Sequence, residues 1–187
     1  MNTVNTLKIA HRFISERIKE GDFWIDATAG RGNDTLFLSK LVGESGKVIA
    51  FDIQSSAIES TKALLEKNGV TNAEVIKDSH HNMDSYAKEE TVDGIVFNFG
   101  YLPGGDHNIC TKAESSIMAI EKGLSLLKVN GVMSLCIYYG GDSGFEEKDA
   151  LMEYLKTIDS KKYTVVTVDF YNRPNCPPIA VFITRDA

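Results

Sequence analysis

The stretch FWIDATAGRGNDT, from Phe23 to Thr35, joins a short apolar run to a helical pattern through a loop with two glycines. The apolar run predicts a buried strand, and the spacing of apolar residues after the loop predicts a helix. Gly30 and Gly32 let the backbone turn sharply and let a ligand approach without a Cβ in the way. The dinucleotide-binding pattern G-x-G-x-x-G is not met, because Thr35 occupies the position of its third glycine. The stretch therefore predicts a strand, a ligand-binding turn and a helix, with a purely structural turn as the alternative.

The alternation of strand and helix continues along the chain. Apolar runs predict seven strands, at Phe23–Ala27, Lys47–Asp52, Ala73–Lys77, Val92–Phe99, Gly131–Tyr139, Tyr163–Phe170 and Ile179–Thr184. Helical spacing predicts helices at Val4–Lys19, Asp34–Val42, Ser55–Asn68, Met83–Lys88, Thr111–Lys128 and Glu146–Ile158.

Strands that alternate with helices form right-handed βαβ units and a mostly parallel sheet covered on both faces. The last two strands are joined by Tyr171–Pro178, a loop without a helix, so they are predicted to be antiparallel neighbours. The predicted fold class is therefore α/β. Its arrangement resembles the Rossmann-like methyltransferase fold, a mostly parallel seven-stranded sheet with the last strand antiparallel and helices on both faces.

The composition is that of an ordinary globular chain. Its 187 residues, 43% hydrophobic and 25% charged, predict one domain over residues 1–187. No run of about 18 apolar residues predicts a membrane span, and the first residues do not form a signal-peptide core. The three cysteines, Cys110, Cys136 and Cys176, lie far apart without a CxxC motif. We therefore expect no metal, no thiol chemistry and a cytoplasmic location.

The net charge of −6 argues against long duplex nucleic acid as a partner, because non-specific phosphate binding usually requires a basic protein. A small folded RNA that contacts a local basic patch remains a candidate partner. The first predicted helix carries such a patch, in which His11 lies among Lys8, Arg12, Arg17 and Lys19. The alternative is a solvated helix face.

Acidic residues end the first three predicted strands, at Asp26, Asp52 and Asp78. Asp52 follows Gly32 by twenty positions, where a carboxylate can accept both hydroxyl groups of a ribose. Asp78 is expected near the amine of an adenine. The combination with the two-glycine loop resembles the S-adenosylmethionine-dependent methyltransferase superfamily. The residues predicted to bind S-adenosylmethionine, and its product S-adenosylhomocysteine, are Asp26, Thr28, Gly30, Gly32, Asn33, Asp34, Thr35, Asp52, Ile53, Asp78, Ser79, His80 and Asn98.

The fourth predicted strand ends in NFGYLPGGD, residues 98–106. In the superfamily that the chain resembles, this strand end faces the reactive methyl group, and several amino-group methyltransferases carry an Asp/Asn-Pro-Pro-Tyr pattern there. An amine attacks through its lone pair, so acceptors such as the Asn98 oxygen are needed to hold its hydrogens and orient it. The predicted catalytic residues are Asn98, Tyr101 and His107, with His107 as the candidate general base. The predicted substrate-binding residues are Phe99, Gly100, Tyr101, Leu102, Pro103, Asp106 and Arg173.

A longer set of motifs, IDATAGRGNDTLFLSKLVG, NFGYLPGGD, YYGGDSGFEE and NRPNCPP, resembles the YtqB-like (MnmM) family of rRNA methylases. The resemblance implies methylation of the exocyclic amine of 5-aminomethyl-2-thiouridine in the tRNA anticodon loop. The family pattern G-N-G-H-D-T has His where this chain has Asn33. The family pattern Y-x-G-H is also replaced, here by Tyr138-Tyr139-Gly140-Gly141.

Several alternatives stay open from the residues alone. One is an rRNA methyltransferase and another is a small-molecule amine N-methyltransferase, which the acidic charge favours. A third is a non-catalytic nucleotide-binding adaptor domain on the same fold. We also expect a homodimer, although no sequence motif indicates one.

Overall fold

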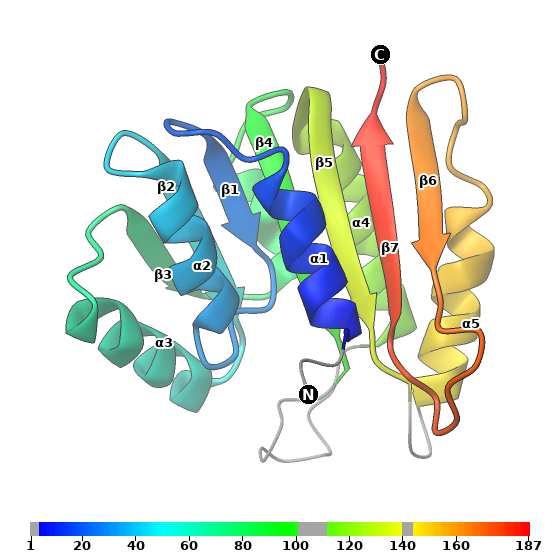
Figure 1. The fold of residues 1–187 in the computed structure, drawn as a ribbon. Coiled ribbons are helices and arrows are strands. Elements are labelled where there is room, and N and C mark those ends of the chain that lie inside the picture. The colour runs from blue at the N-terminus through cyan, green and yellow to red at the C-terminus, as the bar shows by residue number, and fades with distance from the viewer. Residues whose placement is uncertain (1–3, 101–111, 140–143) are drawn as a thin grey trace.

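The computed structural model describes residues 4–100, 112–139 and 144–187. It holds a seven-stranded sheet in the order β3-β2-β1-β4-β5-β7-β6 (Figure 1). The strands are β1 (Phe23–Asp26), β2 (Lys47–Asp52), β3 (Ala73–Lys77), β4 (Val92–Phe99), β5 (Leu127–Ile137), β6 (Tyr163–Val168) and β7 (Ile179–Arg185). The helices are α1 (Thr6–Ser15), α2 (Asn33–Val42), α3 (Ser55–Lys67), the 3₁₀ helix η1 (His80–Ser85), α4 (Ala113–Leu126) and α5 (Gly144–Leu155).

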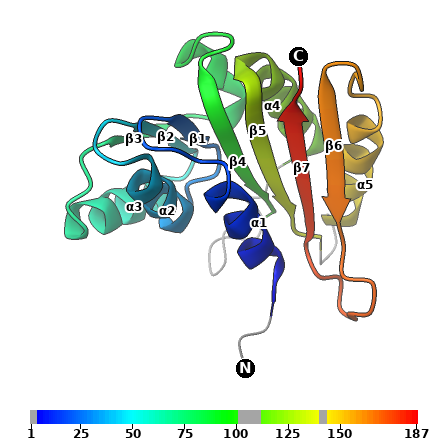
Figure 2. The same cartoon turned by 45° about the horizontal axis from the view of Figure 1, so that its top comes forward.

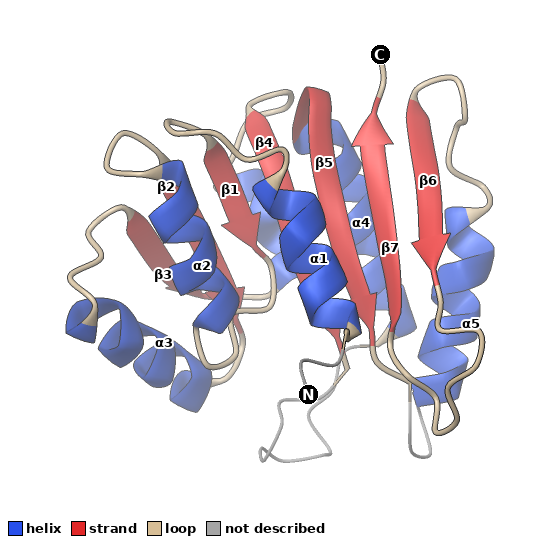
Figure 3. Ribbon diagram, viewed as in Figure 1, coloured by secondary structure: helices blue, strands red, loops and turns tan. Residues whose placement is uncertain are grey.

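The strands β1 to β5 pair in parallel, and β7 pairs antiparallel with both β5 and β6. Helices α1, α2 and α3 lie on one face of the sheet, and α4 and α5 lie on the other (Figures 2 and 3). Central strands that are covered on both faces are expected to be apolar along their length. Accordingly, six of the eight β4 residues are buried, whereas the β6 residues are half-buried or exposed.

The chain leaves β1 toward β2 and β3, then crosses back to place β4 on the other side of β1. This reversal makes a topological switch point between β1 and β4. In open α/β sheets, ligands bind outside the carboxyl ends of the strands at such a point. The fold therefore places the ends of β1 and β4 at the expected binding position.

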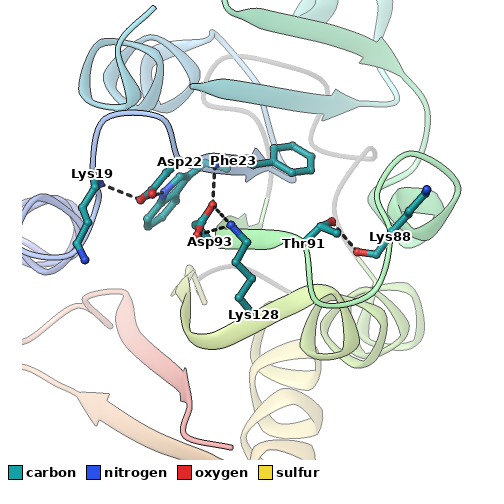
Figure 4. A network of polar contacts seen from close by, with 8 residues as sticks. Lys19, Asp22, Phe23, Lys88, Thr91, Asp93 and Lys128 are labelled. Atoms are coloured by element: carbon teal, nitrogen blue, oxygen red, sulfur yellow. Dashed lines mark hydrogen bonds and ion pairs between the residues drawn. The ribbon is translucent and has the colours of Figure 1, made fainter. Parts of the chain in front are cut away.

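The opposite, amino-terminal edge of these strands is closed by a polar network (Figure 4). One Asp93 oxygen accepts a hydrogen bond of 2.8 Å from the Phe23 backbone, and the Lys128 ammonium contacts both oxygens at 2.8 and 2.9 Å. Next to it, Asp22 accepts a 2.8 Å bond from the Lys19 backbone. These contacts hold the starts of β1, β4 and β5 together without using any residue at the carboxyl edge.

The fold predicted from the sequence is confirmed, including all seven strands and the antiparallel last pair. The helix predicted at Met83–Lys88 is wrong, because the structure has the 3₁₀ helix η1 at His80–Ser85 instead. This segment is rich in Asn, Asp and Ser, whose side chains compete with helical hydrogen bonds.

The boundary between α4 and β5 is also different from the prediction. Helix α4 ends at Leu126, and β5 begins at Leu127, four residues before the predicted start. The β4–β5 register shifts between Val92 and Gly94, and Asn130 has a positive φ of 67°. A bulge of this kind lets a strand continue through residues that read as a turn in the sequence.

Candidate functional site

A cavity of about 850 Å³ opens at the carboxyl ends of β1 to β5. The start of α1 and the β6–β7 connection complete its wall, through Leu7, Cys176 and Pro178. Its other lining residues are Ala27, Thr28, Ala29, Gly30, Arg31, Asn33, Asp34, Phe51, Asp52, Ile53, Gln54, Asp78, Ser79, His80, Asn98, Phe99, Gly100, Ser115, Tyr138 and Tyr139. The cavity therefore lies at the switch point that the topology indicates.

The loop after β1 is shaped by Asp26, whose side chain is fully buried. Its carboxylate accepts a 2.6 Å bond from the Thr35 hydroxyl and a 3.1 Å bond from the Thr28 backbone. Gly32 caps α2 with a positive φ of 80°, and a Cβ there would lie 2.9 Å from the Thr61 backbone. Only glycine fits this position, because both the conformation and the space exclude a side chain.

Asp52 is held in a fixed orientation at the end of β2. One carboxylate oxygen accepts a 3.0 Å bond from the Gly30 backbone, and the other accepts a 2.9 Å bond from the Gln54 backbone. Each oxygen of an ionised carboxylate has a second lone pair. Asp52 can therefore accept two further hydrogen bonds from a ligand in the cavity.

Asp78 accepts three hydrogen bonds, from the Asn82 amide at 2.8 Å, the Ser79 backbone at 2.7 Å and the Tyr86 hydroxyl at 2.9 Å. The bonds from Asn82 and Tyr86 lower the pKa of Asp78. The side chain is therefore ionised at neutral pH. It contributes a negative charge to the β3 side of the cavity.

His80 is neutral at physiological pH, because burial lowers its pKa to about 4. Its Nδ1 lies 3.2 Å from the Ala27 carbonyl oxygen, so this nitrogen carries the hydrogen and donates. The ring also meets Phe97 and Phe99 edge-on. The buried Nε2 atom has no hydrogen-bond partner among the described residues. His80 thus packs the cavity wall rather than transferring protons.

Asn98, at the end of β4, is tied to two other elements. Its backbone donates a 2.8 Å bond to the Thr28 hydroxyl, and its side-chain Nδ2 donates a 2.8 Å bond to Oδ2 of Asp34. The other Asp34 oxygen lies 2.7 Å from Nε2 of His11 on α1. Because the Nδ2 group donates its hydrogen bond to the Asp34 carboxylate, the Oδ1 atom is the part of this amide that can accept a hydrogen bond from another group.

The acidic residues near the cavity influence one another. Burial, followed by the nearby charge of Asp34, raises the pKa of Asp26 to about 7. Asp34, Asp52 and Asp78 line the cavity directly. Arg31 lines it as well, so the three carboxylates outnumber this cation and the lining is negative on balance. A cleft with an excess of one sign of charge attracts ligands of the opposite sign. The site is therefore suited to a cation.

The raised pKa of Asp26 predicts a pH-dependent stability. Between about pH 4 and pH 7 the folded state holds a proton on Asp26 that an unfolded chain, with a pKa of 3.8, has lost. This contribution to the free energy of unfolding should fall as pH rises through that window, by at most about 1.4 kcal/mol per pH unit. Urea unfolding of wild type and of Asp26→Asn, across this range, isolates it. A difference between the two proteins that stays constant with pH would contradict the assignment.

Most of the residues predicted to bind a cofactor do line the cavity. These are Thr28, Gly30, Asn33, Asp34, Asp52, Ile53, Asp78, Ser79, His80 and Asn98. Asp26, Gly32 and Thr35 do not line it, because they are buried behind the loop. The geometry gives these three residues a supporting role in place of the direct contact that we expected.

The predicted substrate residues are placed less completely. Phe99 and Gly100 both line the cavity, and the Phe99 ring is fully buried and stacks on Phe97 at 4.9 Å, so it also belongs to the core. Arg173 donates a 2.6 Å bond to the Val4 carbonyl oxygen and packs over the Phe170 ring. The other predicted positions lie outside the described residues: Tyr101, Leu102, Pro103, Asp106 and His107.

The structure places two residues at the site that the sequence did not assign to it. His11 was grouped with the basic residues of α1, but its ring stacks on Phe37 and contacts Asp34, so it belongs to the site. Tyr138 follows β5 and lines the cavity, and partial burial raises its pKa to about 12, although 40% of the residue stays exposed, so the phenol is neutral. The contact of His11 spans 23 positions, and no local pattern signals it.

Among residues 4–100, 112–139 and 144–187, no group of three or more His, Cys, Asp or Glu side chains is arranged to hold a metal ion. Within the same residues, no helix combines the length and the apolar character that crossing a membrane requires.

Comparison with known proteins gives consistent results. Residues 48–184 match the family model described as "Putative rRNA methylase". The chloroplastic tRNA (mnm(5)s(2)U34)-methyltransferase of Arabidopsis thaliana is 34% identical over 189 residues, which cover 96% of this chain and 69% of that protein.

Two solved structures are similar along nearly the whole chain. A "putative rRNA-methylase" from Clostridium thermocellum is 47% identical with a TM-score of 0.96, and the match covers 99% of this chain and 100% of that one. A "putative methyltransferase" from Streptococcus mutans, solved with S-adenosylhomocysteine, is 34% identical with a TM-score of 0.89, covering 98% and 99%. These findings confirm the prediction of an S-adenosylmethionine-dependent methyltransferase. The chain belongs to the rRNA methylase family and has the Rossmann-like methyltransferase fold.

Proposed function

We propose that this enzyme methylates the aminomethyl group of 5-aminomethyl-2-thiouridine at the wobble position of tRNA. The observation that carries the proposal is Asn98, which lines the cavity with its amide nitrogen bonded to Asp34 and its oxygen left as an acceptor. The Arabidopsis relative, which is named for methylation of this class of nucleoside, supports the choice of substrate.

The cofactor would lie across the ends of β1, β2 and β3. Asp52 would accept the two ribose hydroxyl groups, since each of its oxygens has one lone pair beyond the bonds to Gly30 and Gln54. The adenine would lie between the exposed side chain of Ile53 and the Asp78–Ser79 turn. The methionine part, with its cationic sulfonium, would pass the Gly30 loop toward Asn98.

The reaction needs a neutral amine with its lone pair directed at the methyl carbon. The nitrogen–carbon bond forms as the carbon–sulfur bond breaks, and the sulfur keeps that electron pair to give S-adenosylhomocysteine. The methylated nitrogen then releases one proton. Asn98 Oδ1 would accept one amine hydrogen and so restrict the direction of the lone pair, which can supply a large part of the rate enhancement.

The acidic lining suits both reactants. The sulfonium is a cation, and an aminomethyl group is a cationic ammonium in neutral water, which must release one proton to the solvent before its nitrogen can attack. Asp34, Asp52 and Asp78 would attract both into the cavity. Because acidic residues outnumber Arg31 in this lining, most RNA phosphates would meet another surface.

That surface is the exposed side of α1, beside cavity-lining Leu7. Lys8 and Arg12 are exposed there, and Arg12 pairs with Glu16 at 3.1 Å. We assign the anticodon loop of tRNA to the cavity mouth and its neighbouring phosphates to this helix. A single domain over residues 1–187, a cytoplasmic location and a homodimer complete the proposal.

Nucleoside mass spectrometry of tRNA from cells that lack the gene tests this function. The unmethylated 5-aminomethyl nucleoside should accumulate, and a plasmid with the wild-type gene should restore the methylated one. Unchanged tRNA together with a missing methyl group in rRNA would favour the rRNA alternative. Unchanged RNA of both kinds would favour a small-molecule amine.

A further inference from the structure

His11, Asp34 and Asn98 form a three-residue chain that joins α1, α2 and β4. Nε2 of His11 lies 2.7 Å from Oδ1 of Asp34, and Oδ2 of Asp34 accepts a 2.8 Å bond from Nδ2 of Asn98. Both distances lie within the range of about 2.7–2.9 Å that is typical of hydrogen bonds to a charged acceptor. The three side chains come from three different elements, and Asp34 and Asn98 line the cavity, whereas His11 reaches it only through its contact with Asp34.

His11 is held firmly in this chain. Its ring stacks on Phe37 with the centroids 4.0 Å apart and the planes within 11°. Helix α1 itself is fixed to the β6–β7 connection, because the Thr6 hydroxyl donates a 2.6 Å bond to the Pro178 carbonyl oxygen. The imidazole is thus fixed in both position and plane, and its N–H can orient a partner.

Asp34 transmits this orientation. A carboxylate can only accept hydrogen bonds, so His11 must donate Nε2–H to one oxygen while Asn98 donates Nδ2–H to the other. With both oxygens engaged, the carboxylate plane is fixed, and so is the Asn98 amide that bonds to it. Side chains that position a reacting group usually need such supporting bonds.

We propose that His11 is a positioning residue for methyl transfer, which acts through Asp34 to hold the Asn98 oxygen toward the substrate amine. The inference rests on the proposed function, because that function provides the substrate amine as the partner of the Asn98 oxygen. His11 touches neither reactant and needs no proton transfer in this role. Losing its N–H should therefore lower kcat and leave cofactor binding unchanged.

A matched pair of variants separates the hydrogen bond from the packing. His11→Met and His11→Gln have side chains of equal length that can both pack on Phe37, but only Gln keeps an N–H donor. We expect His11→Met to lower kcat on an aminomethyl-uridine tRNA by about tenfold, since small displacements of reacting groups cost this much or more. His11→Gln should stay within about threefold of wild type. Both should bind S-adenosylhomocysteine like wild type by calorimetry.

A double-mutant cycle completes the test. If His11 acts through Asn98, adding His11→Met to Asn98→Ala should cause no further loss of kcat. A wild-type enzyme that is inactive on this tRNA would reject the proposed substrate. By contrast, His11→Met with wild-type kcat, or with the same tenfold loss in the Asn98→Ala background, would overturn the role of His11 while the proposed function stands.

Discussion

Asn98→Ala should lower kcat by about 100-fold on a tRNA that carries 5-aminomethyl-2-thiouridine, because misplacement of a reacting group costs this much. The variant removes the acceptor oxygen at the end of β4 and the bond to Asp34. Affinity for S-adenosylhomocysteine should stay near that of wild type, because in the proposed binding mode Asn98 faces the methyl group and not the ribose. Single-turnover kinetics and calorimetry measure the two quantities separately. Full turnover by Asn98→Ala would show that the loop after β4 is only structural.

Asn98→Asp is the matched variant, since it keeps the shape of the side chain. It places a second carboxylate where Nδ2 now lies 2.8 Å from Asp34. Two carboxylates at this distance cannot both be ionised easily, so they share a proton and their pKa values separate. A remaining negative charge near the amine also favours the unreactive ammonium. The rate profile of this variant should shift to higher pH, and an unshifted profile would argue against contact with the amine.

Asp52→Ala should weaken binding of S-adenosylmethionine by about 10-fold to 150-fold. This range corresponds to a charge-assisted hydrogen bond of about 1.5–3 kcal/mol. The carboxylate is oriented by the Gly30 and Gln54 backbones, so its loss also removes a support of the glycine loop. Isothermal titration calorimetry measures the change.

Asp93→Asn is the control for this experiment. Asp93 also lies on a central strand and accepts a 2.8 Å bond from a backbone N–H, but it belongs to the amino-terminal edge of the sheet. Its substitution should leave cofactor affinity unchanged. Equal losses in Asp52→Ala and Asp93→Asn would indicate general destabilisation, and unchanged affinity in Asp52→Ala would reject the ribose assignment.

The features that were predictable from the sequence are local ones. The first strand, the aspartate at its end and the glycine loop follow one another directly within Phe23–Thr35, so residues that are neighbours in the sequence are also neighbours in the structure. The acids at Asp52 and Asp78 end parallel strands, and parallel strand ends meet at one edge of a sheet. The connection 171–178 has no helix, and this alone predicted the antiparallel pair β6–β7.

The features that were missed depend on tertiary structure. The alternation of a strand puts Phe97 and Phe99 on one face, and only the packing shows that this face is the core. The contact of His11 with Asp34 requires α1 to lie on the same face as α2, which helical periodicity does not determine. Asp26 was expected to touch the ligand, but the loop folds over it and leaves it fully buried.

Methyl transfer in a purified system tests the central claim most directly. The protein is incubated with S-adenosylmethionine that carries an isotopically labelled methyl group and with tRNA that carries 5-aminomethyl-2-thiouridine, and the nucleosides are analysed by mass spectrometry. The account predicts one labelled methyl group on the aminomethyl nitrogen of that nucleoside, and none on tRNA that lacks the aminomethyl group. Label on another nucleoside, or no label on tRNA from a protein that binds S-adenosylhomocysteine, would contradict it.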